Sequence, residues 1–283
     1  MDKGDRGVAT VFLLTPLVVL LLAFFVLPFG VMFFDSLHLS LLQSPEGSPL
    51  TYANYAKAFG DWFYLGVLLE TVGLGIAVTM LTLILGYPVA YFLARTRSRR
   101  RHLLLFLVIS PLVVSIVIRS YGWMVLLGRA GTVNAVLLSL GLVERPLPLM
   151  YNWFGVTVAL THVLLPFMIL TLASVIEGIP ESLEDTAAVL GAGWWPRFRH
   201  VLLPLSLEGI GAGVTLVFML TIGSFVSILL LGGSDTLVLS LLIYQQVILL
   251  NNNFAAALGM LLLLLSAALL YAQTRTFRVR GSV

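Results

Sequence analysis

Six long apolar stretches constrain this chain more than any other feature. The hydrocarbon core of a bilayer is about 30 Å thick, so a helix needs about 20 apolar residues to cross it. Of the 283 residues, 59% are hydrophobic and only 10% are charged, whereas a soluble domain carries roughly 25% charged residues. We therefore predict an all-α polytopic membrane protein with six transmembrane helices. These helices are expected at residues 8–34, 65–93, 103–127, 153–176, 207–231 and 254–272.

The basic residues predict the orientation of the helices, because lysine and arginine are enriched in cytoplasmic loops. With six spans, one side of the membrane carries Lys3, Arg6, Arg95, Arg97, Arg99, Arg100, Arg101, Arg197, Arg199, Arg275, Arg278 and Arg280. The opposite side carries only Lys57, Arg129 and Arg145. We therefore expect both termini in the cytoplasm. The first stretch is expected to be retained, because it is longer than the roughly 7–15 apolar residues of a signal peptide and no cleavage pattern follows it.

The arginine run RTRSRRRH, residues 95–102, is attributed to this topology signal. An anionic-lipid site is the alternative for the run, and nucleic-acid binding is not expected. The chain has no cysteine, which excludes disulfides and thiol chemistry.

Residues 177–206 separate the fourth and fifth stretches and are expected on the cytoplasmic side. IPESLEDTAAVLG, residues 179–191, has a proline where helices begin, acids in the first turns and a glycine where a helix would end. Leu183, Ala187 and Leu190 fall on one helical face. WPRFRHVLLP, residues 195–204, is expected to form a second short helix from Pro196 to Pro204. The pattern predicts a docking surface, with a partnerless amphipathic helix on the membrane surface as the alternative.

This segment resembles the cytoplasmic loop of type I ABC importer permease subunits, whose pattern is E-A-A-x3-G-x9-I-x-L-P. Asp185-Thr186-Ala187 is followed after three residues by Gly191 and, nine residues later, by Val201-Leu202-Leu203-Pro204. Asp185 stands where the family usually has Glu, and Thr186 where it usually has Ala. The resemblance implies that the loop couples the permease to an ATPase. The implied coupling residues are Glu184, Asp185, Thr186, Ala187, Gly191, Ala192, Val201, Leu203 and Pro204.

Further segments are similar to the spermidine/putrescine branch of that family. They include LTYANYAKAF at residues 50–59, RSYGWMVLLGRAGTVNAVLLSLGL at 119–142 and LLGGSDTLVLSLLIYQQ at 230–246. The resemblance implies one transmembrane domain over residues 1–283, in the bacterial inner membrane, that forms half of a translocation pathway. Its implied partners are a second permease subunit, two copies of an ATPase subunit and an external substrate-binding protein.

The chain itself is not expected to be an enzyme or to bind a cofactor or metal. Its two lysines, Lys3 and Lys57, lie in no P-loop, so the resemblance assigns ATP and Mg²⁺ to the separate ATPase. The sequence has neither an H-E-x-x-H nor a G-x-S-x-G motif. The resemblance implies a polyamine as the substrate. The alternative substrates are opines, phosphonates, other organic ions and inorganic anions. A stand-alone secondary transporter is a further alternative, although no internal repeat supports it.

Polar and aromatic residues in or near the apolar stretches are candidates for the pathway, because ionisable groups are costly in a bilayer. They are Glu70, Arg119, Tyr121, Trp123, His162 and Tyr244. Arg119, counted along a continuous helix from Leu103, is expected toward the outer leaflet, where it could instead serve as an anchor or pair with Glu70. Glycines 209, 211 and 213 predict close helix packing, with a hinge as the alternative.

Overall fold

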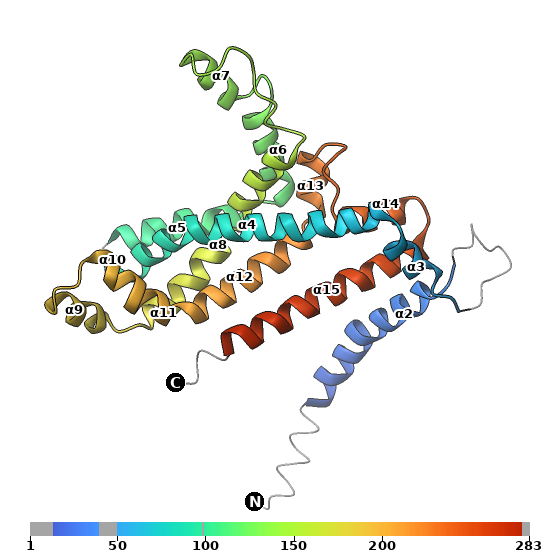
Figure 1. The fold of residues 1–283 in the computed structure, drawn as a ribbon, viewed down its shortest axis with the longest axis horizontal. Helices are drawn as coiled ribbons and strands as arrows, with labels where there is room; N and C mark the ends of the chain where they lie inside the picture. Colours follow the sequence, from blue (N-terminus) through green and yellow to red (C-terminus); the bar gives the residue numbers. More distant parts are fainter. Residues whose placement is uncertain (1–13, 40–49, 98, 279–283) are drawn as a thin grey trace, which may run out of the picture. The chain divides into compact units, whose positions relative to one another are not determined.

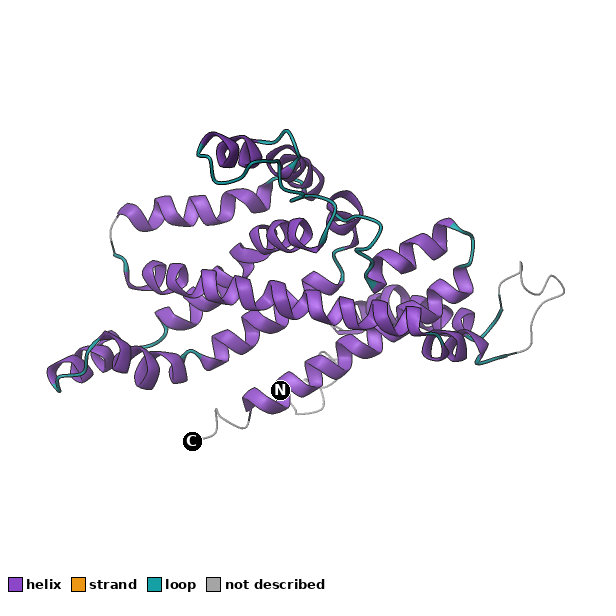
Figure 2. Cartoon of the chain, turned by 45° about the horizontal axis from the view of Figure 1, so that its top comes forward, coloured by secondary structure: helices purple, strands orange, loops and turns teal. Residues whose placement is uncertain are grey.

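The computed structural model describes residues 14–39, 50–97 and 99–278. Every regular element in these ranges is a helix (Figure 2), which confirms the predicted all-α fold. In chain order, with η marking π-helical turns, the elements are η1 (Leu22–Val26), α2 (Leu27–Ser36), α3 (Ala53–Gly60), α4 (Trp62–Arg95), α5 (Arg99–Val113), α6 (Ile116–Leu127), α7 (Thr132–Ser139), α8 (Trp153–Glu177), α9 (Glu181–Val189), α10 (Trp194–Arg197), η2 (Phe198–Leu202), α11 (Leu203–Leu205), α12 (Leu207–Ile222), α13 (Phe225–Leu231), α14 (Leu239–Ile248) and α15 (Asn252–Arg278).

Several of these helices are long and apolar enough to cross a membrane. Within the described ranges five meet this condition by themselves: Leu14–Ser36, Trp62–Arg95, Ile116–Ser139, Trp153–Glu177 and Asn252–Gln273. A sixth is obtained if Trp194–Leu205 and Leu207–Ile222, which are bent by 67° relative to each other, count as one span. The polytopic architecture is therefore confirmed. Residues 8–13 and both termini lie outside the described residues, so the cytoplasmic placement of the termini stays a prediction.

The third predicted span is broken, and the expectation of one helix over residues 103–127 is wrong. Helix α5 ends at Val113 and α6 begins at Ile116, with Ser115 between them in an extended conformation (ψ 141°). Pro111 has no N–H to give to the Leu107 carbonyl, which accepts a hydrogen bond from the Ser110 hydroxyl at 3.2 Å instead. Because the helix is interrupted, the depth of Arg119 cannot be counted along a straight line from Leu103.

The fifth predicted span is also divided. Helix α12 ends at Ile222, Gly223 and Ser224 turn the chain, and α13 runs from Phe225 to Leu231. The apolar composition of residues 207–231 conceals this turn, because the turn residues are small and uncharged.

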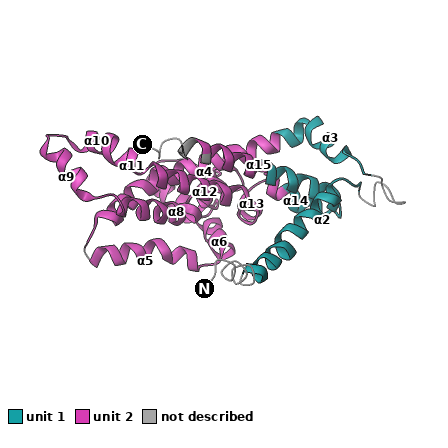
Figure 3. Ribbon diagram, turned by 90° about the horizontal axis from the view of Figure 1, so that it is seen from below, with its two compact units in different colours: residues 1–65, 242–264 teal, residues 66–241, 265–283 magenta. Residues whose placement is uncertain are grey.

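The chain divides into two compact units (Figure 3): residues 1–65 with 242–264, and residues 66–241 with 265–283. In the first unit, α3 is fastened to the end of α2. The Asn54 amide donates to the carbonyls of Ser36 and His38 at 2.9 and 2.8 Å. The Lys57 ammonium lies 4.6 Å from the ring centroid of Phe254 at the start of α15, a cation–π contact that links α3 to that helix.

The second unit is built around α8, with α4 and α12 running alongside it (Figure 1). Two glycines of α12 face α8 at close range. A Cβ added at Gly209 would lie 2.8 Å from Cβ of Val175, and one at Gly213 would lie 2.7 Å from the sulfur of Met168. Only glycine allows so short a separation of the two helices, so the predicted close packing is confirmed at these positions.

Candidate functional site

Residues 177–206 form two short helical pieces at one end of α4, α8 and α12 (Figure 1), as the sequence predicted. The first piece is α9, which starts directly after Pro180. It ends in a Schellman motif: Gly191 has φ +87°, its N–H donates to the Ala188 carbonyl, and the Ala192 N–H donates to the Ala187 carbonyl, both at 2.9 Å. Gly191 therefore supplies the left-handed residue that ends α9.

The second piece differs from the prediction at both ends. It begins at Trp194 instead of Pro196, and it continues through the π-helical turn η2 into α11, so that Pro204 lies within the helix. The bend comes at Ser206, between the end of α11 and the start of α12.

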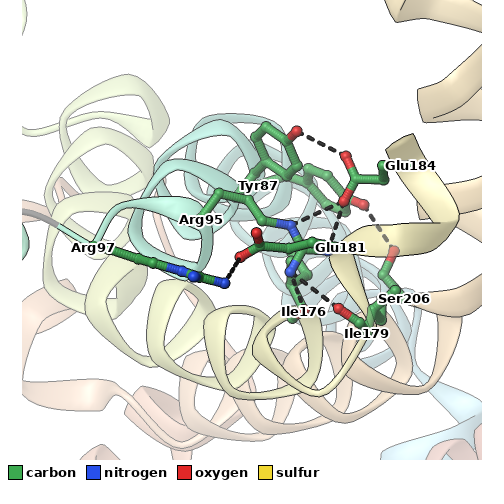
Figure 4. A network of polar contacts seen from close by, with 9 residues as sticks. Tyr87, Arg95, Arg97, Ile176, Ile179, Glu181, Glu184 and Ser206 are labelled. Carbon is green, nitrogen blue, oxygen red and sulfur yellow. Dashed lines mark hydrogen bonds and ion pairs between the residues drawn. The ribbon is translucent and has the colours of Figure 1, made fainter. Parts of the chain in front are cut away.

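Glu184 of α9 is held by the end of α4 (Figure 4). Its carboxylate accepts from Arg95 Nη2 at 2.6 Å and Nε at 2.9 Å, and from the Tyr91 hydroxyl at 2.9 Å. The Nη1 group of Arg95 also donates to the carbonyls of Ile176 and Ile179, each at 3.1 Å. The side chains of Arg95 and Glu184 are only 14% and 13% exposed. One guanidinium thus connects α4, the end of α8 and α9.

Two further ion pairs extend this connection. Arg97 Nη2 lies 3.0 Å from Glu181 Oε1, and Arg101 pairs with Glu177. In the three pairs, arginines later in the sequence bind acids that are earlier in the sequence: Arg95 binds Glu184, Arg97 binds Glu181 and Arg101 binds Glu177. This is the order expected of two antiparallel segments. The sequence interpretation assigned these arginines to topology, with an anionic-lipid site as the alternative. It missed the pairs because no local pattern links positions 76 to 89 residues apart.

An aromatic cluster joins the second piece to α4. The Phe198 ring stacks on Trp194 and Trp195, with centroids 5.6 and 5.5 Å apart, and meets Tyr87 of α4 edge-on at 5.4 Å. The Tyr87 hydroxyl is 2.8 Å from the Ser206 hydroxyl (Figure 4). Tyr87 and Ser206 are buried, so this bond satisfies two polar groups inside the helix junction.

The outer side of α9 is exposed and carries apolar residues among polar ones. Val189 and Leu190 are 88% and 82% exposed, and Leu183 is 44% exposed. Asp185 and Thr186 also face outward, whereas Glu184 points inward to Arg95. The remaining predicted coupling residues are half-buried, except the exposed Gly191 and Pro204; the half-buried ones are Ala187, Ala192, Val201 and Leu203.

Three of the candidate pathway residues come together in the second unit. Trp123 Nε1 of α6 donates to Nδ1 of His162 in α8 at 3.3 Å, and the two rings lie edge-on at 5.4 Å. Arg119, one turn before Trp123, is close enough to His162 for an electrostatic interaction. Its Nε and Nη1 atoms are buried and have no hydrogen-bond acceptor among the described residues. The three side chains form a donor-rich group between α6 and α8.

The other candidates do not join this group. Tyr121 and Glu70 are exposed, and Tyr244 of α14 belongs to the first compact unit. In the part of the chain that the structure describes, Arg119 forms no ion pair with Glu70, so that suggested pairing is wrong. The same described ranges contain no group of three or more His, Cys, Asp or Glu side chains that could hold a metal ion.

The fold is shared with solved ABC transporters. It matches a chain of a bacterial ABC transporter involved in the import of the acidic polysaccharide alginate, with a TM-score of 0.75 and 19% identity, over 98% of this chain and 99% of that one. The two chains therefore have the same architecture.

Residues 86–277 match the family described as the binding-protein-dependent transport system inner membrane component. The chain belongs to this family. It is 37% identical over 190 residues to the spermidine/putrescine transport system permease protein PotB of Haemophilus influenzae, covering 67% of this chain and 66% of that protein. It is 34% identical over 214 residues to a probable molybdenum ABC transporter permease protein of Haloferax volcanii, covering 75% and 70%. Family membership makes the chain a multi-pass component of the inner membrane.

Proposed function

We propose that this chain is a permease subunit of an ATP-driven importer and forms half of its translocation pathway. A second permease subunit completes the pathway, two copies of an ATPase subunit bind and hydrolyse ATP with Mg²⁺, and a binding protein delivers the substrate from outside. Membership of a binding-protein-dependent transport family supports this assembly. In this proposal the chain performs no catalysis and holds no cofactor.

The α9 surface is the proposed contact with the ATPase. The single observation that carries this role is the contrast between two sets of residues: Glu184 fixes α9 to Arg95, while Leu183, Val189 and Leu190 are exposed apolar side chains. Exposed apolar residues on a firmly held helix favour docking to a protein partner. Movement of the ATPase would therefore displace α9 as a rigid element, and Arg95 would pass the displacement to α4 and α8.

ATP binding then acts by population shift. It favours the arrangement in which the two ATPase subunits are closed, and the attached permeases shift from inward-facing to outward-facing. Substrate enters from the binding protein, and hydrolysis returns the pathway to its inward-facing state.

The proposed substrate is a polyamine such as spermidine or putrescine. The name of the PotB relative supports this choice, and the rings of Tyr121 and Trp123 offer faces to which organic cations bind. A small inorganic anion is the second candidate. The unpaired donors of Arg119 beside His162 favour an anion, and the name of the molybdenum permease relative agrees with it.

The assembly is tested by affinity purification of the chain from its native membrane in mild detergent, followed by mass spectrometry. Recovery of a P-loop ATPase and a second multi-span permease is the expected result. Recovery of the chain alone, or as a homo-oligomer without an ATPase, would contradict the proposal and favour a secondary transporter.

The substrate is tested with the recovered complex and its binding protein in proteoliposomes. ATP-dependent uptake of labelled putrescine or spermidine, unaffected by molybdate, is expected. An Arg119→Gln variant separates the candidates: polyamine uptake should persist, because removing a positive charge does not weaken cation binding. Uptake of molybdate by the wild type and its loss in the variant would establish the anion instead.

A further inference from the structure

A cavity of about 510 Å³ opens between the last turns of α4 and the segment formed by α10, η2 and α11. This volume falls within the roughly 300–1,000 Å³ of typical ligand sites. Its wall is mostly apolar, and its main contributors are Leu83, Ile84 and Phe92 from α4 and Trp194, Phe198 and Leu202 from the facing segment. Such a wall accepts a hydrocarbon chain far better than a polar solute.

Two charged side chains line this cavity, and among the residues that the structure describes only one of them has an ion-pair partner. The Glu184 carboxylate is occupied by Arg95 and Tyr91. Arg197 is the other, and its Nε atom is buried without a hydrogen-bond acceptor among the described residues. A buried donor on a charged group is costly unless an acceptor reaches it. Arg197 therefore brings a positive charge, with no ion-pair partner among the described residues, to the side of an apolar wall.

Several residues that line the cavity are exposed on the surface of the chain. Ile84 is 65% and Phe92 49% exposed on α4, a helix long and apolar enough to span the membrane. Trp194 and Trp195, 61% and 58% exposed, lie at the other edge of the opening, and tryptophan is enriched where hydrocarbon meets the headgroup region. With α4 spanning the bilayer, Ile84 and Phe92 are expected to contact hydrocarbon, and the tryptophans and Arg197 to lie at the level of the headgroups.

We propose that this cavity binds one acyl chain of an anionic phospholipid, whose phosphate accepts a hydrogen bond from the Arg197 guanidinium. The lipid fills the space between α4 and the segment that follows α9. The assignment does not depend on which solute the chain transports. It differs from a lipid site on the arginine run, because Arg95, Arg97 and Arg101 of that run are paired with acids.

The test is quenching of tryptophan fluorescence by lipids brominated on the acyl chain. The full chain, with the subunits that co-purify with it, is placed in nanodiscs that contain a known fraction of one brominated lipid. The contribution of the cavity is the part of the quenching that disappears in a W194F/W195F variant. Brominated phosphatidylglycerol is expected to quench this part at a roughly fivefold lower lipid fraction than brominated phosphatidylcholine. This is the preference for an anionic lipid that one basic residue near the membrane surface provides.

Arg197→Gln should abolish this preference. Arg199→Gln is the matched control. Arg199 carries the same charge two residues further along the chain, but it is exposed and does not line the cavity. Equal quenching by the two lipids in the wild type would overturn the proposal. So would an equal loss in both variants, which would indicate only a general surface charge. Quenching that occurs in the isolated chain and vanishes in the complex would assign the cavity to a partner subunit and also overturn it.

Discussion

Arg95, the last residue of α4, and Glu184 of α9 form an ion pair with an Nη2–Oε1 distance of 2.6 Å, although 89 residues separate them. Both side chains are largely buried, whereas the neighbouring pair Arg97–Glu181 connects the same region with side chains 84% and 44% exposed. The two pairs offer an internal comparison between a buried and an exposed ion pair.

Glu184→Gln is expected to loosen α9. Removing one partner of a buried pair leaves the other charge unsatisfied, and we expect a loss of about 2–3 kcal/mol in the local opening free energy of residues 181–189. Hydrogen exchange of the α9 amides measures this quantity. Glu181→Gln is the control and should cost less than about 1 kcal/mol, because exposed ion pairs contribute little. Equal effects of the two variants would show that Glu184 does not anchor α9.

Gly191→Arg is expected to abolish uptake while membrane insertion remains normal. A Cβ at this position would meet no atom within 4 Å, so the constraint is the positive φ, which costs a non-glycine residue roughly 1–2 kcal/mol. The added side chain would also project beside the α9 surface. Uptake in proteoliposomes and the amount of inserted protein are the measurements.

Two controls separate conformation from size at this turn. Gly191→Asn should retain most uptake, because asparagine tolerates the left-handed region. Gly193→Ala should be neutral, because its φ is −64° and the nearest contact of its Cβ, Pro196 Cδ, is at 3.8 Å. Wild-type uptake by Gly191→Arg would refute the coupling role of this turn.

Leu190→Asp is expected to weaken association with the ATPase without lowering the stability of the permease. Leu190 is 82% exposed, so its replacement removes no internal contact of consequence, while a charge in an apolar interface is costly. Co-purification of the ATPase and thermal unfolding of the permease test the two parts. Leu140→Asp, at a 65% exposed position after α7, is the control and should leave association unchanged. An undiminished yield of ATPase with Leu190→Asp would place the contact elsewhere.

Gly213→Val is expected to destabilise the second compact unit by about 1–3 kcal/mol, the usual cost of overpacking. Its side chain would collide with the sulfur of Met168, which a Cβ already approaches to 2.7 Å. Thermal unfolding in detergent measures the effect. Gly73→Ala provides the contrast, since nothing lies within 4 Å of its Cβ and it sits in the interior of α4. Alanine there should stabilise the helix by roughly 0.5–1 kcal/mol, and an equal loss in both variants would contradict close packing at Gly213.

Local signals predicted α9 well, because its limits depend on nearby residues. Pro180, the acids of the first turn and Gly191 each act within a few positions of where they stand. The breaks at Ser115 and Gly223 were missed, since apolar composition alone does not distinguish a continuous span from a bent one. Glu184 was assigned to the coupling surface, but its inward direction depends on Arg95, a distant residue that helix periodicity cannot locate.

The end of α8 depends on a neighbouring helix. Carbonyl groups at a helix end lack the usual donors, and Arg95 supplies N–H groups to Ile176 and Ile179 from α4. Two nitrogens of the Arg95 guanidinium donate to Glu184 while the third donates to these carbonyls. Lysine could not replace it, because an ammonium has a single nitrogen. The N–H groups of Gly178 and Ile179 also donate to the carbonyls of Val175 and Ile176, each at 3.1 Å, so Arg95 adds bonds from α4 to an end that its own backbone caps in part. Withdrawing α4 would remove these added bonds, so the stability of the last turn of α8 would depend on the position of α4.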